Sequence, residues 1–112
     1  MAQKLTANTK YVRLLAWLRR TFPLQHPVRV RRVQIKDCGT CEFNDDTNRF
    51  HIQIDCRQCS ALARDSLIHE WAHALTWFCP ADDDHCAEWG VAYARIYREY
   101  LKWNYGRGPE EN

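Results

Sequence analysis

The chain has 112 residues, which suits one domain and is too short for two separate hydrophobic cores. Hydrophobic residues make up 46% of the sequence and aromatic residues 12%, enough to build a packed interior and to argue against global disorder. The formal net charge is only +2, so a nucleic-acid partner is possible but is not indicated by the charge. We therefore expect a single domain over residues 1–112, and a monomer.

The sequence contains no run of about 18 uncharged apolar residues that could cross a membrane. Its first residues, MAQKLTANTK, lack the apolar segment of a secretory signal. We therefore expect no membrane partner and a cytoplasmic location, in the host cytoplasm if a phage encodes the chain.

The first expected element is a helix over residues 8–22, in which apolar residues recur at helical spacing and Pro23 ends the pattern. A strand follows over 28–35, where valines alternate with arginines. The alternation changes phase by one residue at Arg32, which predicts a β-bulge at that position.

Two further strands are predicted over 39–43 and 49–55, on either side of the turn-forming residues 44–48. This pattern is typical of a β-hairpin, and Phe50, Ile52 and Ile54 share one face of its second arm. Together with the preceding strand, the hairpin predicts a three-stranded antiparallel sheet.

A second helix is predicted over 61–78, with Ser60 as its cap and the Cys79-Pro80 pair as its end. Its apolar positions surround most of the helix, which is typical of a helix buried on nearly all sides. A last helix is predicted over 87–103. The order of elements indicates an α+β fold with an N-terminal helix, a sheet, a buried helix and a C-terminal helix.

The buried helix contains His69-Glu70-Trp71-Ala72-His73, which has the H-E-x-x-H pattern. Histidines four residues apart project from one helix face about 6 Å apart, close enough for both imidazoles to bind one Zn²⁺. Glu70 is turned about 100° aside, from where its carboxylate can take the proton of a metal-bound water without ligating the metal. Two hydrogen-bonded core histidines are the alternative, but they leave the desolvation cost of three polar side chains in an apolar helix unexplained. The pattern therefore predicts a catalytic zinc with Glu70 as general base.

A catalytic zinc needs a third protein ligand and an open position for water. His85 is one candidate, because zinc commonly takes imidazole and this residue stands where the acidic loop 81–84 meets the last helix. Glu88 is the competitor, because thermolysin-type sites draw a glutamate ligand from a following helix. The residues by themselves leave this choice open.

The segment HEWAHAL, followed by HCAEWG at 85–90, resembles the SprT-like (Spartan-related) zinc metallopeptidases. In that family H-E-x-x-H is followed by H-G-x-E and an aromatic residue, and the resemblance covers about residues 28–103. It implies a minimal zincin-like fold, proteolytic activity, His85 as the third zinc ligand beside His69 and His73, and Glu70 as the catalytic base. Cys86 stands where the family usually has glycine, and the resemblance does not extend to DNA-linked substrates.

Two C-x-x-C pairs, Cys38–Cys41 and Cys56–Cys59, are separated by 14 residues, close to the spacing of a four-cysteine zinc site. With a turn at 45–48, Cys38 lies nearly opposite Asp55, so both pairs gather at the open end of the hairpin. One interpretation is a second, structural zinc that clamps the strands to the start of the buried helix. Disulfides and unconnected thiols are the alternatives.

Together these features predict a cytosolic zinc endopeptidase that binds a protein or peptide substrate extended along a strand edge. Two alternatives stay open. One is a zinc-stabilised adaptor that holds nucleic acid or a protein without catalysis, and the other is hydrolysis of a non-peptide amide.

Tyr93 and Tyr97, one turn apart on the last helix, are either oxyanion stabilisers or part of a packing stripe.

Overall fold

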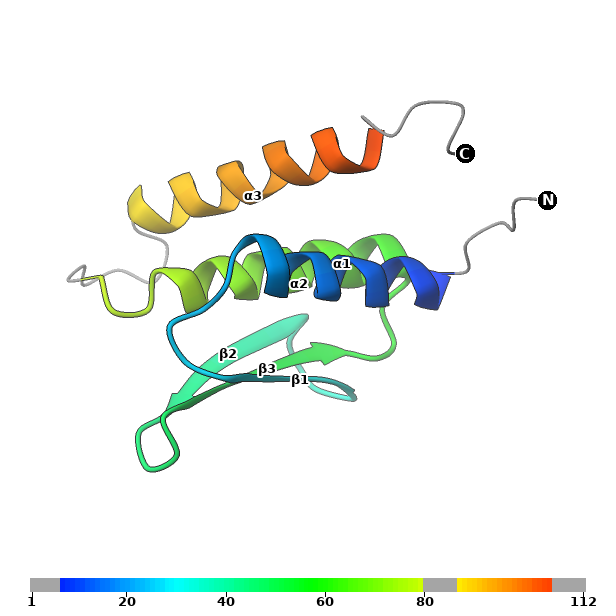
Figure 1. The fold of residues 1–112 in the computed structure, drawn as a ribbon. Helices are drawn as coiled ribbons and strands as arrows, with labels where there is room; N and C mark the ends of the chain where they lie inside the picture. Colours follow the sequence, from blue (N-terminus) through cyan, green and yellow to red (C-terminus); the bar gives the residue numbers. More distant parts are fainter. Residues whose placement is uncertain (1–6, 80–86, 106–112) are drawn as a thin grey trace.

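The computed structural model describes residues 7–79 and 87–105. The elements, in chain order, are helix α1 (Ala7–Thr21), strands β1 (Val28–Val33), β2 (Gly39–Asn44) and β3 (Arg49–Asp55), and helices α2 (Ser60–Leu75) and α3 (Ala87–Tyr105). They form three layers, with α1 and α2 between the sheet and α3 (Figure 1). The expected α+β class, with three helices and a three-stranded sheet, is confirmed. No helix in the described ranges is long and apolar enough to cross a membrane.

The sheet is mixed, so the prediction of three antiparallel strands was wrong. β3 lies at its centre, in the order β1-β3-β2, and pairs antiparallel with β2, as the hairpin predicts. β1 instead pairs parallel with β3, from Val28 opposite Phe50 to Val33 opposite Asp55. The central position goes to the strand whose inward residues, Phe50, Ile52 and Ile54, have no exposed surface, because neighbours on both sides shield it best.

The predicted bulge at Arg32 is absent, because β1 and β3 pair residue for residue over the whole of β1, which ends at Val33 rather than at residue 35. Arg32 simply continues the inward alternation of Val28 and Val30. Its guanidinium lies 4.8 Å from the centroid of the Tyr11 ring and donates to the carbonyl oxygens of Cys56 and Gln58, at 3.3 and 3.5 Å. An inward arginine with these partners requires no change of phase.

Helix α2 is the central element, since it packs against β2, β3, α1 and α3. Its cap is Cys59 rather than the predicted Ser60, and Cys59 makes no side-chain capping hydrogen bond. The helix ends at Leu75, short of the predicted Phe78, where the Thr76 hydroxyl donates to the carbonyl of Ala72 at 2.9 Å. Half of its residues are buried, and the buried set is Ala63, Ser66, Leu67, Ile68, Glu70, Trp71, Ala72 and Ala74.

Candidate active site

The two histidines of the H-E-x-x-H pattern lie together on the face of α2 that is turned toward α3. Their ring centroids are 5.0 Å apart, and the rings are inclined at 63°. This proximity follows directly from the i, i+4 spacing on an unbroken helix. The His69 side chain is 34% exposed, so the pair remains open to a ligand on one side.

Trp89, in the first turns of α3, contacts both imidazoles. Its ring stacks on His73 at 5.4 Å and meets the ring of His69 edge-on at 4.8 Å. Its Nε1 donates to the carbonyl oxygen of His69 at 3.3 Å. In the sequence, Trp89 is marked only as the aromatic residue of the segment HCAEWG. The signal that could have identified this contact is its place on the same face of the last helix as Tyr93.

Glu70 points to a different side of α2, toward β2. Only 7% of the residue is exposed, and its Oε2 lies 3.9 Å from Nε2 of His69. The carboxylate passes directly over Gly39, since a Cβ there would lie 3.0 Å from Cγ and 3.2 Å from Oε2 of Glu70. A side chain at this position of β2 would therefore force Glu70 to move by a few tenths of an ångström, and glycine avoids this crowding.

The environment of Glu70 disfavours its charged form. Burial, and after it the negative charge of Asp37, raises the pKa of Glu70 from 4.5 to about 7. A carboxyl group with this pKa can both accept and release a proton at neutral pH. A perturbed acid beside two imidazoles is also the kind of group that marks functional sites.

Tyr93 and Tyr97 both donate their hydroxyl hydrogen to Oδ1 of Asp65 on α2, Tyr93 over 2.7 Å. Burial, followed by the Asp65 carboxylate, raises the pKa of both phenols. These hydroxyls therefore link α3 to α2, which agrees with the packing interpretation and leaves neither proton directed at a reacting group. Asp65, one turn before His69, was missed because no motif marks it.

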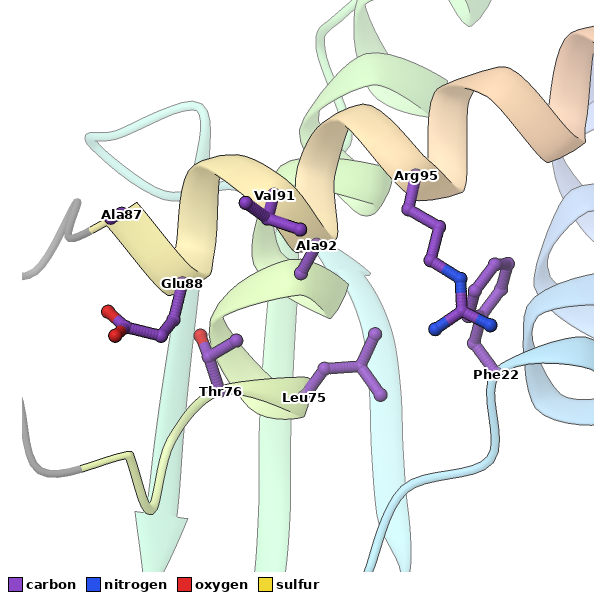
Figure 2. Close-up of a pocket in the computed structure, with 8 residues that line it drawn as sticks. All are labelled: Phe22, Leu75, Thr76, Ala87, Glu88, Val91, Ala92 and Arg95. Atoms are coloured by element: carbon purple, nitrogen blue, oxygen red, sulfur yellow. The ribbon is translucent and has the colours of Figure 1, made fainter.

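Of the two candidates for the third zinc ligand, the structure describes only Glu88. His85, with the acidic loop 81–84, lies outside the described residues. Glu88 lies in the first turn of α3 and lines a cavity of about 480 Å³ (Figure 2). Its other lining residues are Phe22, Leu75, Thr76, Ala87, Val91, Ala92 and Arg95. Over residues 7–79 and 87–105 no three His, Cys, Asp or Glu side chains form a group that could hold a metal, so the described residues supply no complete ligand set.

The four cysteines of the C-x-x-C pairs do not converge. The carbonyl of Cys38 accepts a hydrogen bond from the Asp55 amide at 3.0 Å, which confirms the predicted register. Cys41, however, lies half-buried on the inward face of β2, where burial, and after it the charges of Glu70 and Glu42, raises its pKa to about 12. Zinc ligation requires a thiolate, which this setting opposes.

The cysteines in the described ranges are all free thiols. Cys38, Cys56 and Cys59 are exposed, whereas Cys41 and Cys79 are half-buried. The second zinc predicted on Cys38, Cys41, Cys56 and Cys59 therefore has no ligand group in this part of the chain. Cys86 lies outside the described residues.

The comparisons with known proteins identify no relative. No protein-family model matches the chain, and neither a curated protein nor a solved structure is similar to it.

Proposed function

We propose that the chain is a zinc-dependent endopeptidase with His69, His73 and His85 as zinc ligands and Glu70 as general base. One observation carries the proposal: two imidazoles 5.0 Å apart on one helix face adjoin a buried carboxylate, whose Oε2 lies 3.9 Å from His69. The resemblance of the sequence to the SprT-like metallopeptidases supports the same assignment.

The donor set suits a zinc ion. Neutral imidazole is a preferred zinc ligand, and two on one helix face leave room for a third ligand and for water. His69 and His73 would supply the first two ligands, and His85, which precedes α3 in the sequence, would supply the third. When bound, zinc would polarise the scissile carbonyl and lower the pKa of its water toward about 7.

Glu70 then does the proton transfer. Its pKa of about 7 allows the carboxylate to take the proton of the attacking water at neutral pH and to pass it to the leaving amine. Burial favours this role, because the protonated acid is the more stable form in a site with little water. Trp89 supports the imidazoles by covering both rings from α3.

The free edge of β2 is the best place for an extended substrate. β2 is the strand that Glu70 touches, and within the described part of the chain it pairs only with β3. An unpaired strand edge presents backbone donors and acceptors to an added peptide strand. β1, the other edge strand, is separated from β2 by the whole width of β3. We therefore assign the substrate to β2.

Metal content and cleavage together test the proposal. Elemental analysis of protein purified without added metal should find one zinc per chain in the wild type and a loss of that zinc in His85→Ala. Glu70→Gln should keep its zinc and its fold but lose at least about a hundredfold in peptide cleavage. Glu88→Ala should keep its zinc, which makes it the matched control.

Four results would contradict the assignment. A wild type without metal, or undiminished cleavage by Glu70→Gln, would refute the peptidase. Loss of zinc in Glu88→Ala together with its retention in His85→Ala would move the third ligand to Glu88. A wild type that holds zinc and binds a partner but cleaves nothing would favour the adaptor.

A further inference from the structure

Aromatic side chains are exposed at the hairpin end of β2, just after α2. Phe78 is 51% exposed and Trp77 is 41% exposed. The Phe78 ring meets the ring of Phe43 on β2 at 5.2 Å, and the ring of His26 lies 5.5 Å from Phe78 and 5.0 Å from Phe43. We call His26, Phe43, Trp77 and Phe78 the aromatic patch.

Packing of the core does not explain why the rings of the patch are exposed. Phe50, beneath it, is already fully buried, and its ring contacts those of Trp77 and Phe78 at 6.0 and 6.2 Å. The other large apolar residues that are exposed in the described ranges are aliphatic and lie on the three helices, at Val12, Leu62, Val91 and Leu101. Two exposed aromatic rings that belong to one cluster are the feature that marks an interaction surface rather than ordinary surface composition.

The patch is aligned with the proposed site. Gly39, at the start of β2, lies against Glu70 of α2, and Phe43, near its end, lies against Phe78, which follows α2. β2 and α2 therefore run alongside each other in the same direction. Gly39 and Phe43 are four residues apart on a strand, about 14 Å, and Cys41 and Phe43 are about 7 Å apart.

We propose that the aromatic patch is a distal subsite for the peptide substrate, which takes an aromatic or large aliphatic side chain two to four residues from the cleaved bond. This inference rests on the proposed peptidase function and on the assignment of the substrate to β2. A peptide paired with β2 opposite Gly39 and Cys41 reaches the patch after that number of residues.

The chemistry of the patch determines which side chains it binds. Pairing along β2 uses only backbone groups and gives no choice of sequence, whereas alternate side chains of the added strand reach the surface beside it. An apolar side chain there would remove its own surface and that of Phe78 and Trp77 from water. Aromatic side chains gain further from edge-to-face contact with these rings. A small polar side chain gains neither.

Paired peptides test the subsite. One unstructured peptide that the protein cleaves is made with Phe or with Ser at each of the four positions on both sides of the cleaved bond, which mass spectrometry locates. Phe at one or more of the positions two to four residues from that bond should raise kcat/KM about tenfold over Ser. Phe78→Ala should abolish this preference, so that the Phe and Ser peptides are cleaved with the same kcat/KM, and Trp77→Ala should weaken it. Leu62→Ala, which truncates an equally exposed side chain on α2, should keep it.

A binding measurement separates failure of the subsite from failure of the peptidase. Fluorescence anisotropy with the labelled Phe and Ser peptides should show tighter binding of the Phe peptide to the wild type and equal binding to Phe78→Ala. If nothing is cleaved but this difference in binding is found, the proposed peptidase activity is wrong, while the aromatic patch is confirmed as a peptide-binding surface. Equal binding of both peptides to the wild type would refute the subsite.

The same assay identifies a different occupant. Displacement of the Phe peptide by a single-stranded oligonucleotide would assign the patch to nucleic acid. A concentration-dependent dimer that is lost in Phe78→Ala would assign it to a second copy of the chain. Either result overturns the proposal. A melting temperature of Phe78→Ala close to that of the wild type shows that the variant is folded.

Discussion

Replacing Glu70 by Gln should stabilise the metal-free protein at neutral and alkaline pH. Burial raises the pKa of Glu70 from 4.5 to about 7, so the folded chain favours the protonated acid, while the unfolded chain ionises at the usual value. A carboxyl group with a raised pKa therefore contributes fully to the stability of the fold below pH 4.5, and this stability is lost as the pH rises through about 7. Gln keeps the shape of the side chain and cannot ionise.

The expected size of the effect follows from the two pKa values. A difference of one pKa unit corresponds to about 1.4 kcal/mol of folding free energy. The rise from 4.5 to about 7 therefore costs the wild type about 3 kcal/mol at pH 8 and nothing at pH 4. A domain of this size has a total unfolding free energy of about 5–15 kcal/mol, so the gain in Glu70→Gln should be large, about 10 °C in melting temperature.

Urea unfolding with a chelator present, at several pH values from 4 to 8, measures the effect. The difference between Glu70→Gln and the wild type should grow with pH. Glu42→Gln is the matched control, because Glu42 is an exposed glutamate on the strand beside Glu70, and its difference should stay small throughout. An equal difference at pH 4 and pH 8, or a less stable Glu70→Gln at pH 8, would refute the reasoning.

Three further predictions concern the surroundings of the site. Gly39→Ala should destabilise the fold by about 1–3 kcal/mol in urea unfolding, because its Cβ would lie 3.0 Å from Cγ of Glu70. Gly90→Ala should instead stabilise α3 by up to about 1 kcal/mol, because its Cβ would meet nothing within 4 Å beyond the backbone of its own helix. Asp65→Ala should cost about 2 kcal/mol in urea unfolding, more than Tyr97→Phe, because it leaves both phenols without their acceptor. Trp89→Ala should lower zinc affinity about tenfold in chelator competition, because it uncovers both imidazoles. Equal effects of the two glycine variants, a smaller cost for Asp65→Ala than for Tyr97→Phe, or unchanged zinc affinity would each contradict the contact concerned.

Local signals explain the elements that the sequence predicts well. The hairpin turn is an example, since Oδ1 of Asn44 accepts hydrogen bonds from the Asp46 and Thr47 amides, and Asn48 adopts a positive φ of 53°. Both features lie within five residues of chain and depend on residue types that favour them. The helical periods, and the pairing of His69 with His73, are local in the same sense.

The partner of a strand lies far away in the sequence, which is why the predicted antiparallel direction of β1 was wrong. Alternation of side chains is the same in parallel and antiparallel strands, so the sequence of β1 does not reveal which way it pairs. The inward position of Arg32 depends on loop carbonyls at Cys56 and Gln58, more than twenty residues later in the chain. No periodicity within residues 28–35 could have predicted them.

The structure does not gather the four cysteines into one group, for a reason that the sequence does contain. Spacing placed the two pairs at one end of the hairpin, and the bond between Asp55 and Cys38 bears this out. Cys41, however, is two residues before Phe43 and so shares its inward face. A thiol on the core side of a strand cannot meet thiols in the exposed loop around Cys56 and Cys59 without a change in register.

Glu70 and Gly39 each lower the stability of the fold, and their contact is the strongest reason to connect the buried carboxylate with function. A buried carboxylate lowers stability at neutral pH, and a glycine in a strand lowers it further. The two residues are linked, since a Cβ at position 39 would lie only 3.0 Å from Cγ and 3.2 Å from Oε2 of Glu70. They meet beside His69 and on β2, an edge strand that α2 packs against. Stability alone would favour an apolar side chain and a β-branched residue at these positions, so a chemical role for Glu70 explains the pair better than packing does.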